Sequence, residues 1–316
     1  MLDFLLLICG LAGLWYGSEL LIRGAMALAD RYRITDAMFG MLVLAIGTDL
    51  PELFVAFDAS FRSLAGEDLS GIVIGSAVGS TIAQFALVFG VAGFIGYSPM
   101  KRMFLPRNTI FLVGSIVALY VFSMDGGISR AEGALLILYY AAYLAVLVLR
   151  RVEIEGDDGE VVHMPAWRGW LILASGLVLL LIAAELTVVY AAEFAREVGL
   201  SNIAVSAIVI GMGSSLPELS VSFVALLRKR GGLSVGNLIG SNVLDTLLVP
   251  GIAAVISPLV ISSAILMVDL PVLLVTTLLV LLFLYVSRRG VRGPEATILL
   301  FVYLSYVAIR LVGPGS

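Results

Sequence analysis

The sequence predicts an all-α polytopic membrane protein with ten transmembrane helices arranged as two inverted five-helix repeats. Three observations support this prediction: the apolar composition, ten long apolar runs, and motifs that recur at a constant spacing. Of the 316 residues, 60% are hydrophobic and 13% are charged, and the mean hydropathy is +1.09. A soluble domain carries roughly 25% charged residues. So little charge cannot coat a soluble globule, which excludes a soluble enzyme and indicates the lipid bilayer as the environment.

The composition also excludes several kinds of partner and site. The net charge of −4 provides no basic surface for phosphates, so we expect no nucleic-acid partner. Cys9 is the only cysteine, which rules out an internal disulfide and a thiolate metal cluster. His163 is the only histidine and lies in a polar connector, which rules out a multi-histidine metal site. No nucleotide motif is present, and we expect no cofactor and no obligate protein partner.

Each predicted span is an apolar run close to the length of about 20 residues that a membrane helix needs. The first run is not a cleaved signal peptide, because it lacks a basic start and contains Glu19 and Arg23. The acidic connector 151–166 divides the chain into a first repeat, 1–150, and a second repeat, 167–313. The predicted spans are 2–27, 35–60, 70–96, 104–123, 128–150, 167–195, 202–227, 234–257, 264–287 and 293–312.

The basic residues support this span count and give an orientation. Fifteen of the 19 lysines and arginines fall in loops on one side, and the other four are Arg62, Arg130, Arg196 and Arg310. Cytoplasmic loops carry the excess of basic residues. We therefore predict a multi-pass protein of the plasma membrane with both termini extracellular and a cytoplasmic connector.

The two halves carry matching sequences. Glu19 and Glu185 are 166 positions apart, and so are Glu52 and Glu218 in the segments Leu50-Pro51-Glu52-Leu53 and Leu216-Pro217-Glu218-Leu219. A second block, 75–84, recurs as 236–245 at an offset of 161. Because each half has five predicted spans, an odd number, the copies enter the bilayer from opposite sides. Inverted repeats of this kind are typical of alternating-access transporters with a site at the midplane.

Four carboxylates lie near the middle of apolar spans: Asp49, Glu52, Glu218 and Asp245. No lysine or arginine lies mid-span to neutralise them. A charge at the bilayer centre costs at least about 2.5–3.5 kcal/mol, and such residues usually serve ion pathways. A bound cation is the simplest way to keep them ionised, so we predict a cation site.

The residues around these acids suit a hard cation. Pro51 and Pro217 have no N–H, which frees the carbonyl groups of Gly47 and Gly213. Calcium takes about 6–8 oxygen ligands in a flexible shell, and sodium accepts similar ligands, whereas magnesium prefers a tighter octahedron. The other candidate ligands are the polar side chains of Thr48, Ser214, Ser215, Ser80, Ser241 and Gln84.

Small residues dominate two blocks, 71–80 and 236–241, at Gly-x-x-x-Gly spacing. This spacing lets helices approach closely. We expect the blocks to pack the third and eighth spans against the second and seventh spans.

These motifs resemble the calcium/cation antiporter superfamily, most closely the prokaryotic sodium/calcium exchangers, over essentially the whole chain. The segments 47–52 and 213–218 resemble the two repeat motifs. The resemblance implies that Glu52 and Glu218 bind calcium centrally and that Asp245 helps to form monovalent-ion sites. It also implies exchange of cytoplasmic calcium for external sodium. In this exchange a two-helix bundle, formed by the first and sixth spans, slides past the core, and an ion gradient drives the transport.

Two residues depart from the family pattern. Asp49 stands where the first motif usually has serine, and Gln84 stands where the first block usually has asparagine. The four carboxylates exceed the charge of one Ca²⁺ by two units, and such crowding disfavours full ionisation. Asp49 would then be protonated for part of the cycle. The alternative function is therefore a proton-coupled calcium antiporter that uses Asp49 to carry the proton.

Two other classes compete with an antiporter. Asp49 and Asp245 could form the dyad of an intramembrane aspartyl protease, but Ser215 occupies the position where the repeat would place a matching aspartate. The second class is a cation channel, and inverted repeats around one charged site favour alternating access over a continuous pore.

Four further acids are secondary candidates. Glu19 and Glu185 either line an access path or have local partners near the interface. We expect Asp58 and Asp269 to lie near the membrane–water interfaces, where water solvates their carboxylates.

Overall fold

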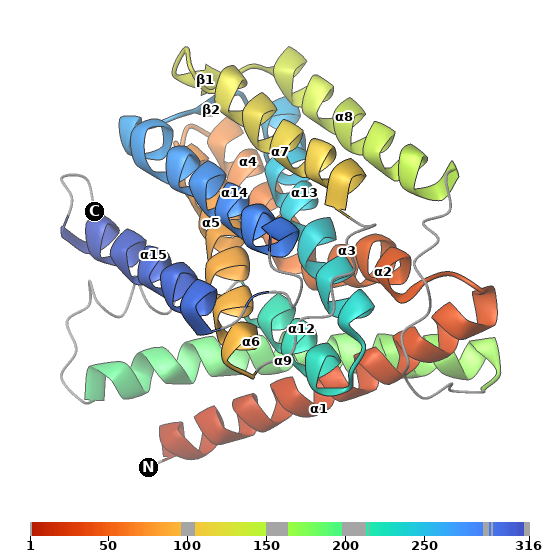
Figure 1. The fold of residues 1–316 in the computed structure, drawn as a ribbon. Helices are drawn as coiled ribbons and strands as arrows, with labels where there is room; N and C mark the ends of the chain where they lie inside the picture. Colours follow the sequence, from red (N-terminus) through yellow and green to blue (C-terminus); the bar gives the residue numbers. More distant parts are fainter. Residues whose placement is uncertain are drawn as a thin grey trace.

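The computed structural model describes residues 2–95, 105–149, 164–197, 213, 215–286, 291 and 293–312. Those ranges are nearly all helical (Figure 1). The first half contains α1 (Leu2–Tyr32), α2 (Asp36–Phe39), the π-helical turn η1 (Gly40–Leu44), α3 (Ala45–Thr48), α4 (Leu50–Leu64), α5 (Ser70–Ala83), the π-helical turn η2 (Gln84–Val88), α6 (Phe89–Ile95), α7 (Leu105–Phe122), β1 (Gly127–Ile128) and α8 (Arg130–Leu149). The second half contains α9 (Ala166–Glu197), α12 (Leu216–Leu227), α13 (Gly231–Ile256), β2 (Leu259–Val260), the π-helical turn η5 (Ile265–Asp269), α14 (Leu270–Val286) and α15 (Gly293–Val312).

Six helices in the described ranges are long and apolar enough to cross a membrane. A seventh crossing is possible where 36–48 and 50–64 form one span that bends by 44°. The apolar helices 109–123 and 216–227 are shorter. A helical membrane architecture follows, while the count of ten spans and the inverted arrangement of the halves stay predictions.

The long helices α1 and α9 lie side by side across one end of the molecule (Figure 1). A Cβ on Gly10 would meet the Thr187 hydroxyl at 2.5 Å, and a Cβ on Gly24 would meet the Leu173 backbone nitrogen at 2.7 Å. The order of these contacts makes the helices antiparallel, and the glycines allow the close approach. With 31 and 32 residues, each helix is about 46–48 Å long and must tilt to fit a hydrocarbon core of about 30 Å.

α13 runs through the centre of the molecule and packs against α2, η1, α4, α5, α8 and α12. A Cβ on Gly240 would meet the Ala45 Cβ at 2.6 Å, and a Cβ on Gly236 would overlap the carbonyl oxygen of Ala37. The close packing predicted for the second small-residue block is therefore confirmed. In the first block, no neighbouring helix of the described residues lies within 4 Å of a Cβ built at Gly75. Residue 203, which is the repeat equivalent of Ala37, lies outside the described residues, so the close packing of this block stays a prediction.

The tight packing of Gly236 gives a stability prediction. Gly236→Ala forces a methyl group into the α2 backbone, so we expect it to lower the free energy of unfolding by about 1–3 kcal/mol. Val255→Ala, at an exposed position of the same helix, is the control and should change the free energy of unfolding by less than about 0.5 kcal/mol. Thermal unfolding of both variants in detergent measures the difference. Equal midpoints would contradict the packing described here.

Two polar contacts join the halves away from the centre. Asp36, at the start of α2, accepts a hydrogen bond of 3.0 Å from Arg230, which precedes α13, and both side chains are largely buried. At another position, β1 pairs with β2 in antiparallel register, Gly127 with Val260 and Ile128 with Leu259. The ten-span prediction places the two loops that carry β1 and β2 on the same side of the membrane, which agrees with this pairing.

Candidate cation-binding site

The first motif interrupts its helix at the predicted position. α3 ends at Thr48, Asp49 lies at the break, and α4 begins at Leu50 with Pro51 as its second residue. The bend of 44° between 36–48 and 50–64 confirms the predicted helix break. Because Pro51 has no N–H, the carbonyl group of Gly47 loses its usual partner within the helix.

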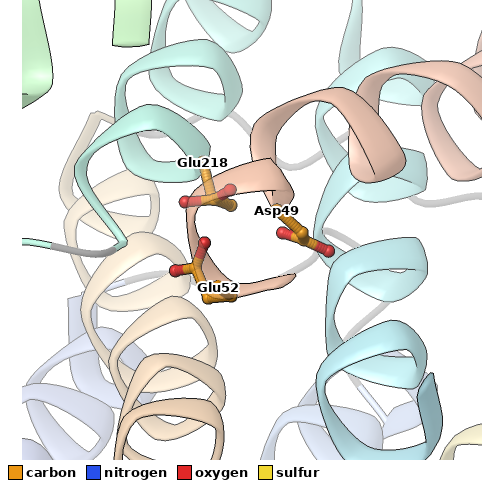
Figure 2. A group of neighbouring side chains, drawn as sticks. All are labelled: Asp49, Glu52 and Glu218. Atoms are coloured by element: carbon orange, nitrogen blue, oxygen red, sulfur yellow. The ribbon is translucent and has the colours of Figure 1, made fainter. Parts of the chain in front are cut away.

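The second motif begins a helix in the same way. Ser215 is the N-cap residue of α12, Pro217 follows within the first turn, and Glu218 lies in that turn. Both motifs therefore place a glutamate just after a proline at the start of a helix. The N-terminal ends of α4 and α12 meet near the centre, where Glu52 and Glu218 point toward each other (Figure 2).

Three buried carboxylates form the centre of the site. One carboxylate oxygen from each of Asp49, Glu52 and Glu218 lies within 4.8 Å of the others. The residues are 0%, 2% and 0% exposed. Two oxygens on opposite sides of a Ca²⁺ ion would be about 4.6–5.2 Å apart at usual ligand distances. The group therefore has the size, charge and ligand chemistry to hold one cation of this kind.

Asp245 on α13 adds a fourth carboxylate. It is fully buried and interacts electrostatically with Asp49 and Glu218. Among the described residues, no donor reaches the carboxylate oxygens of Asp49, Glu218 or Asp245 with hydrogen-bond geometry. Buried carboxylates without donors are costly unless a cation or protons neutralise them. The four predicted acids therefore share one buried region, contributed by both halves.

Hydroxyl and amide groups line another part of the site. Ser215 donates a hydrogen bond of 2.8 Å to Ser80, and Gln84 donates one of 3.1 Å to the same hydroxyl. Asn242 donates a bond of 3.2 Å to the amide oxygen of Gln84. Ser241 is buried, and its hydroxyl has no partner among the described residues. This network links α5 and η2 of the first half to α12 and α13 of the second half.

Sequence reasoning missed three polar residues of this region. Asn237 accepts a bond of 3.4 Å from Thr48 and donates one of 3.3 Å to Ser222. Thr81 lies beside the Asp245 carboxylate, and Asn242 contacts Gln84. All three are polar residues inside apolar helices, which was the available signal, but the repeat pattern alone marks them only as members of the repeated blocks.

The motif glycines face α9. A Cβ on Gly47 would lie 3.4 Å from Leu177, and a Cβ on Gly213 would lie 2.7 Å from Val188. Apolar side chains of α9 therefore cover both motifs. Ser214 and residues 151–163 of the connector, which include His163, lie outside the described residues.

The secondary acids have different surroundings. Glu19 has a local partner, since Arg228 forms an ion pair with it, whereas Glu185 is exposed. Asp58 is exposed, as expected. The expectation for Asp269 is wrong: its side chain is 1% exposed and its carboxylate oxygen lies 3.5 Å from Arg310. Asp269 ends the π-helical turn η5, and there the side chain is enclosed beside α15, where Arg310 lies.

Comparison with known proteins gives consistent matches over nearly the whole chain. Residues 2–149 and 168–312 match the family described as "Sodium/calcium exchanger protein". The putative antiporter CaxA of Alkalimonas amylolytica is 29% identical over 307 residues, covering 94% of this chain and 95% of CaxA. The sodium/calcium exchanger MaX1 of Methanosarcina acetivorans is 26% identical over 350 residues, with coverage of 97% and 98%. A solved structure of the sodium-calcium exchanger NCX_Mj has a TM-score of 0.81 at 27% identity, with 98% of each chain covered.

Proposed function

Because the chain belongs to the sodium/calcium exchanger protein family, we propose that it is a secondary active antiporter that exchanges Ca²⁺ for Na⁺ by alternating access. Family membership makes it a multi-pass integral membrane transporter and not an enzyme, which removes the aspartyl protease hypothesis. Cation antiport involving calcium follows from the family and the fold. Three further points belong to our proposal: sodium as the coupling ion, the residues that bind the ions, and the membrane topology.

One observation carries the proposal: carboxylates from both halves meet, fully buried, at a spacing that fits one cation. We assign Glu52 and Glu218 as the central calcium ligands. Asp49 and Asp245 flank them and supply charge for sodium ions that occupy the site in turn. Sodium and calcium have similar sizes and accept the same oxygen ligands, so each can displace the other. The remaining proposed ligands are Thr48, Ser80, Gln84, Ser214, Ser215, Ser241 and the carbonyl groups of Gly47 and Gly213.

The proposed topology has ten spans in two inverted halves, 1–150 and 167–313. The acidic connector 151–166 would be cytoplasmic, and both termini would lie outside the cell, in the plasma membrane. The tightly packed pair of α1 and α9 would move past the remaining helices. Alternating access requires such a movement, because the carboxylate site has to face each side in turn.

Calcium uptake into proteoliposomes tests the proposed exchange. Vesicles loaded with sodium should accumulate calcium when diluted into sodium-free medium, and vesicles loaded with potassium should not. Uptake that proceeds equally with either internal cation would overturn sodium coupling.

Proton coupling is a second candidate, and Asp49 is the observation that favours it. The buried site holds four carboxylates, two charges more than one Ca²⁺ neutralises. If protons are exchanged, a pH gradient alone should drive calcium uptake without sodium. Asp49→Ser, which copies the second-half residue Ser215, should reduce this component at least about tenfold and preserve sodium-driven uptake.

Uptake measured against pH and sodium separately checks this second candidate. Wild-type uptake that needs sodium and ignores an imposed pH gradient would exclude it. Thr48→Ser retains the hydroxyl beside Asp49 and serves as the control for a conservative change at the helix break.

A further inference from the structure

An ion pair ties α1 to the end of α12. The Nε atom of Arg228 donates a hydrogen bond of 2.9 Å to Oε2 of Glu19, and its Nη2 atom donates to Oε1 of the same carboxylate. Arg228 directly follows α12, at its C-cap. Ser18, next to Glu19, donates a bond of 2.8 Å to Ser220 of α12. These contacts hold α1 along α12, the helix that carries Glu218, from Ser220 to Arg228 at its C-terminal end.

Both members of this ion pair have copies in the other repeat. Glu185 follows Glu19 by 166 positions, and Arg228 follows Arg62 by 166 positions, which is the spacing of the motif glutamates. Glu185 lies on α9 and Arg62 lies in the last turn of α4. The sequence therefore encodes the same glutamate and arginine at equivalent places in both copies.

Only one of the two equivalent pairs is formed. Arg62 instead binds Glu67 at 2.5 Å and lies 3.8 Å from Asp58. Glu185 is exposed and has no ion pair with any described residue. The structure thus breaks the repeat symmetry at this contact.

We propose that the Glu19–Arg228 pair and the Glu185–Arg62 pair are alternating latches, one for each access state. The inference rests on the proposed antiport by inverted repeats. In a protein built from two inverted repeats, the second access state arises when each repeat adopts the conformation that the other repeat had in the first access state. The contact from α1 to the end of α12 is then replaced by the contact from α9 to the end of α4. The distribution of basic residues places Arg62 and Arg228 on opposite sides of the membrane, so each latch closes a different side.

The packing of the two long helices makes the latches mutually exclusive. Glycine contacts join α1 and α9 closely, so we expect the two helices to move as one unit. A shift that brings Glu185 to Arg62 therefore takes Glu19 away from Arg228. Arg62 exchanges one acidic partner for another, and such exposed pairs differ little in energy. The change of latch is consequently easy to reverse, as transport requires.

The latches are not equal. The serine contact at Ser18 and Ser220 has no polar equivalent, because the repeat positions are Ala184 and Phe54. The Glu19–Arg228 side therefore has an extra hydrogen bond. This difference favours the state seen here when no gradient is applied.

Chemical cross-linking tests the missing latch. In a Cys9→Ala background, Arg62→Cys and Glu185→Cys are combined and treated with a short bis-maleimide, and the linked peptides are measured by mass spectrometry. Glu19→Cys with Arg228→Cys is the positive control. Arg62→Cys with Arg168→Cys is the negative control, since Arg168 is exposed and lies 17 residues, about 25 Å, from Glu185 toward the opposite end of α9.

We expect the Arg62–Glu185 positions to cross-link above the Arg168 control. Adding Arg228→Gln, which removes the opposite latch, should raise this yield about threefold to tenfold. Yields at the level of the Arg168 control, while the positive control links normally, would overturn the proposal. The reaction needs no transported ion, so failed cross-linking with normal calcium uptake refutes the latches alone. Expected cross-linking without calcium uptake refutes the proposed substrates instead.

Discussion

Replacing Glu52 or Glu218 by glutamine is expected to abolish calcium exchange. Glutamine preserves the size of the side chain and one oxygen, but it removes one of the charges that offset the loss of the ion's water shell. We expect calcium affinity to fall at least about 100-fold, equivalent to about 2.7 kcal/mol. Sodium-driven uptake in proteoliposomes measures the loss, and Glu197→Gln, a change at an exposed position at the end of α9, is the control.

A stability measurement separates lost binding from misfolding. Calcium should raise the unfolding temperature of the wild-type protein, since a ligand that binds only the folded state stabilises it. The glutamine variants should unfold at a similar or higher temperature without calcium, because one buried charge has been removed, and calcium should no longer shift the transition. Variants that retain the calcium-induced shift would contradict the assignment of these ligands.

Replacing Pro51 by alanine is expected to lower exchange about tenfold without destabilising the protein. Alanine restores the N–H that Pro51 lacks, so the helix can continue through Asp49 and bind the carbonyl oxygen of Gly47. The cage then loses an oxygen, and Glu52 turns relative to Glu218. Initial rates of calcium uptake measure this effect.

A second proline provides the control for this experiment. Pro250 lies inside α13, is buried, and is five residues beyond Asp245. Pro250→Ala also restores an N–H in an apolar helix, but it leaves both motifs intact. We expect normal exchange from it. Equal losses in the two variants would show that the break at Pro51 has no special role in the site.

The helix breaks and the convergence of the acids were predictable from local chemistry. Pro51 with Gly47 four residues before it favours a helix break, whereas Pro250, with Thr246 at that position, lies inside α13. A carboxylate such as Glu218 cannot face lipid. The repeat added long-range information, since motifs at a constant offset occupy equivalent places in the two halves. This is why Asp245, which is distant from Glu52 in the sequence, could be assigned to the same site.

Features that depend on the packing of particular faces were not predictable. Asp269 is enclosed beside Arg310 at the end of the π-helical turn η5, and no residue pattern in the sequence indicates that turn. The contacts of Asn237 and Asn242 depend on the rotation of α13 against its neighbours. From the sequence alone, Glu19 could either line an access path or have a local partner. Its partner, Arg228, is 209 positions away in the sequence, so only the structure shows the contact.

Anomalous diffraction from crystals soaked with calcium tests the central claim most directly. We predict a single strong calcium peak between the carboxylates of Glu52 and Glu218, which disappears when sodium replaces calcium and in the Glu218→Gln variant. A calcium peak elsewhere, or no peak at calcium concentrations that support uptake, would contradict the assignment of this site.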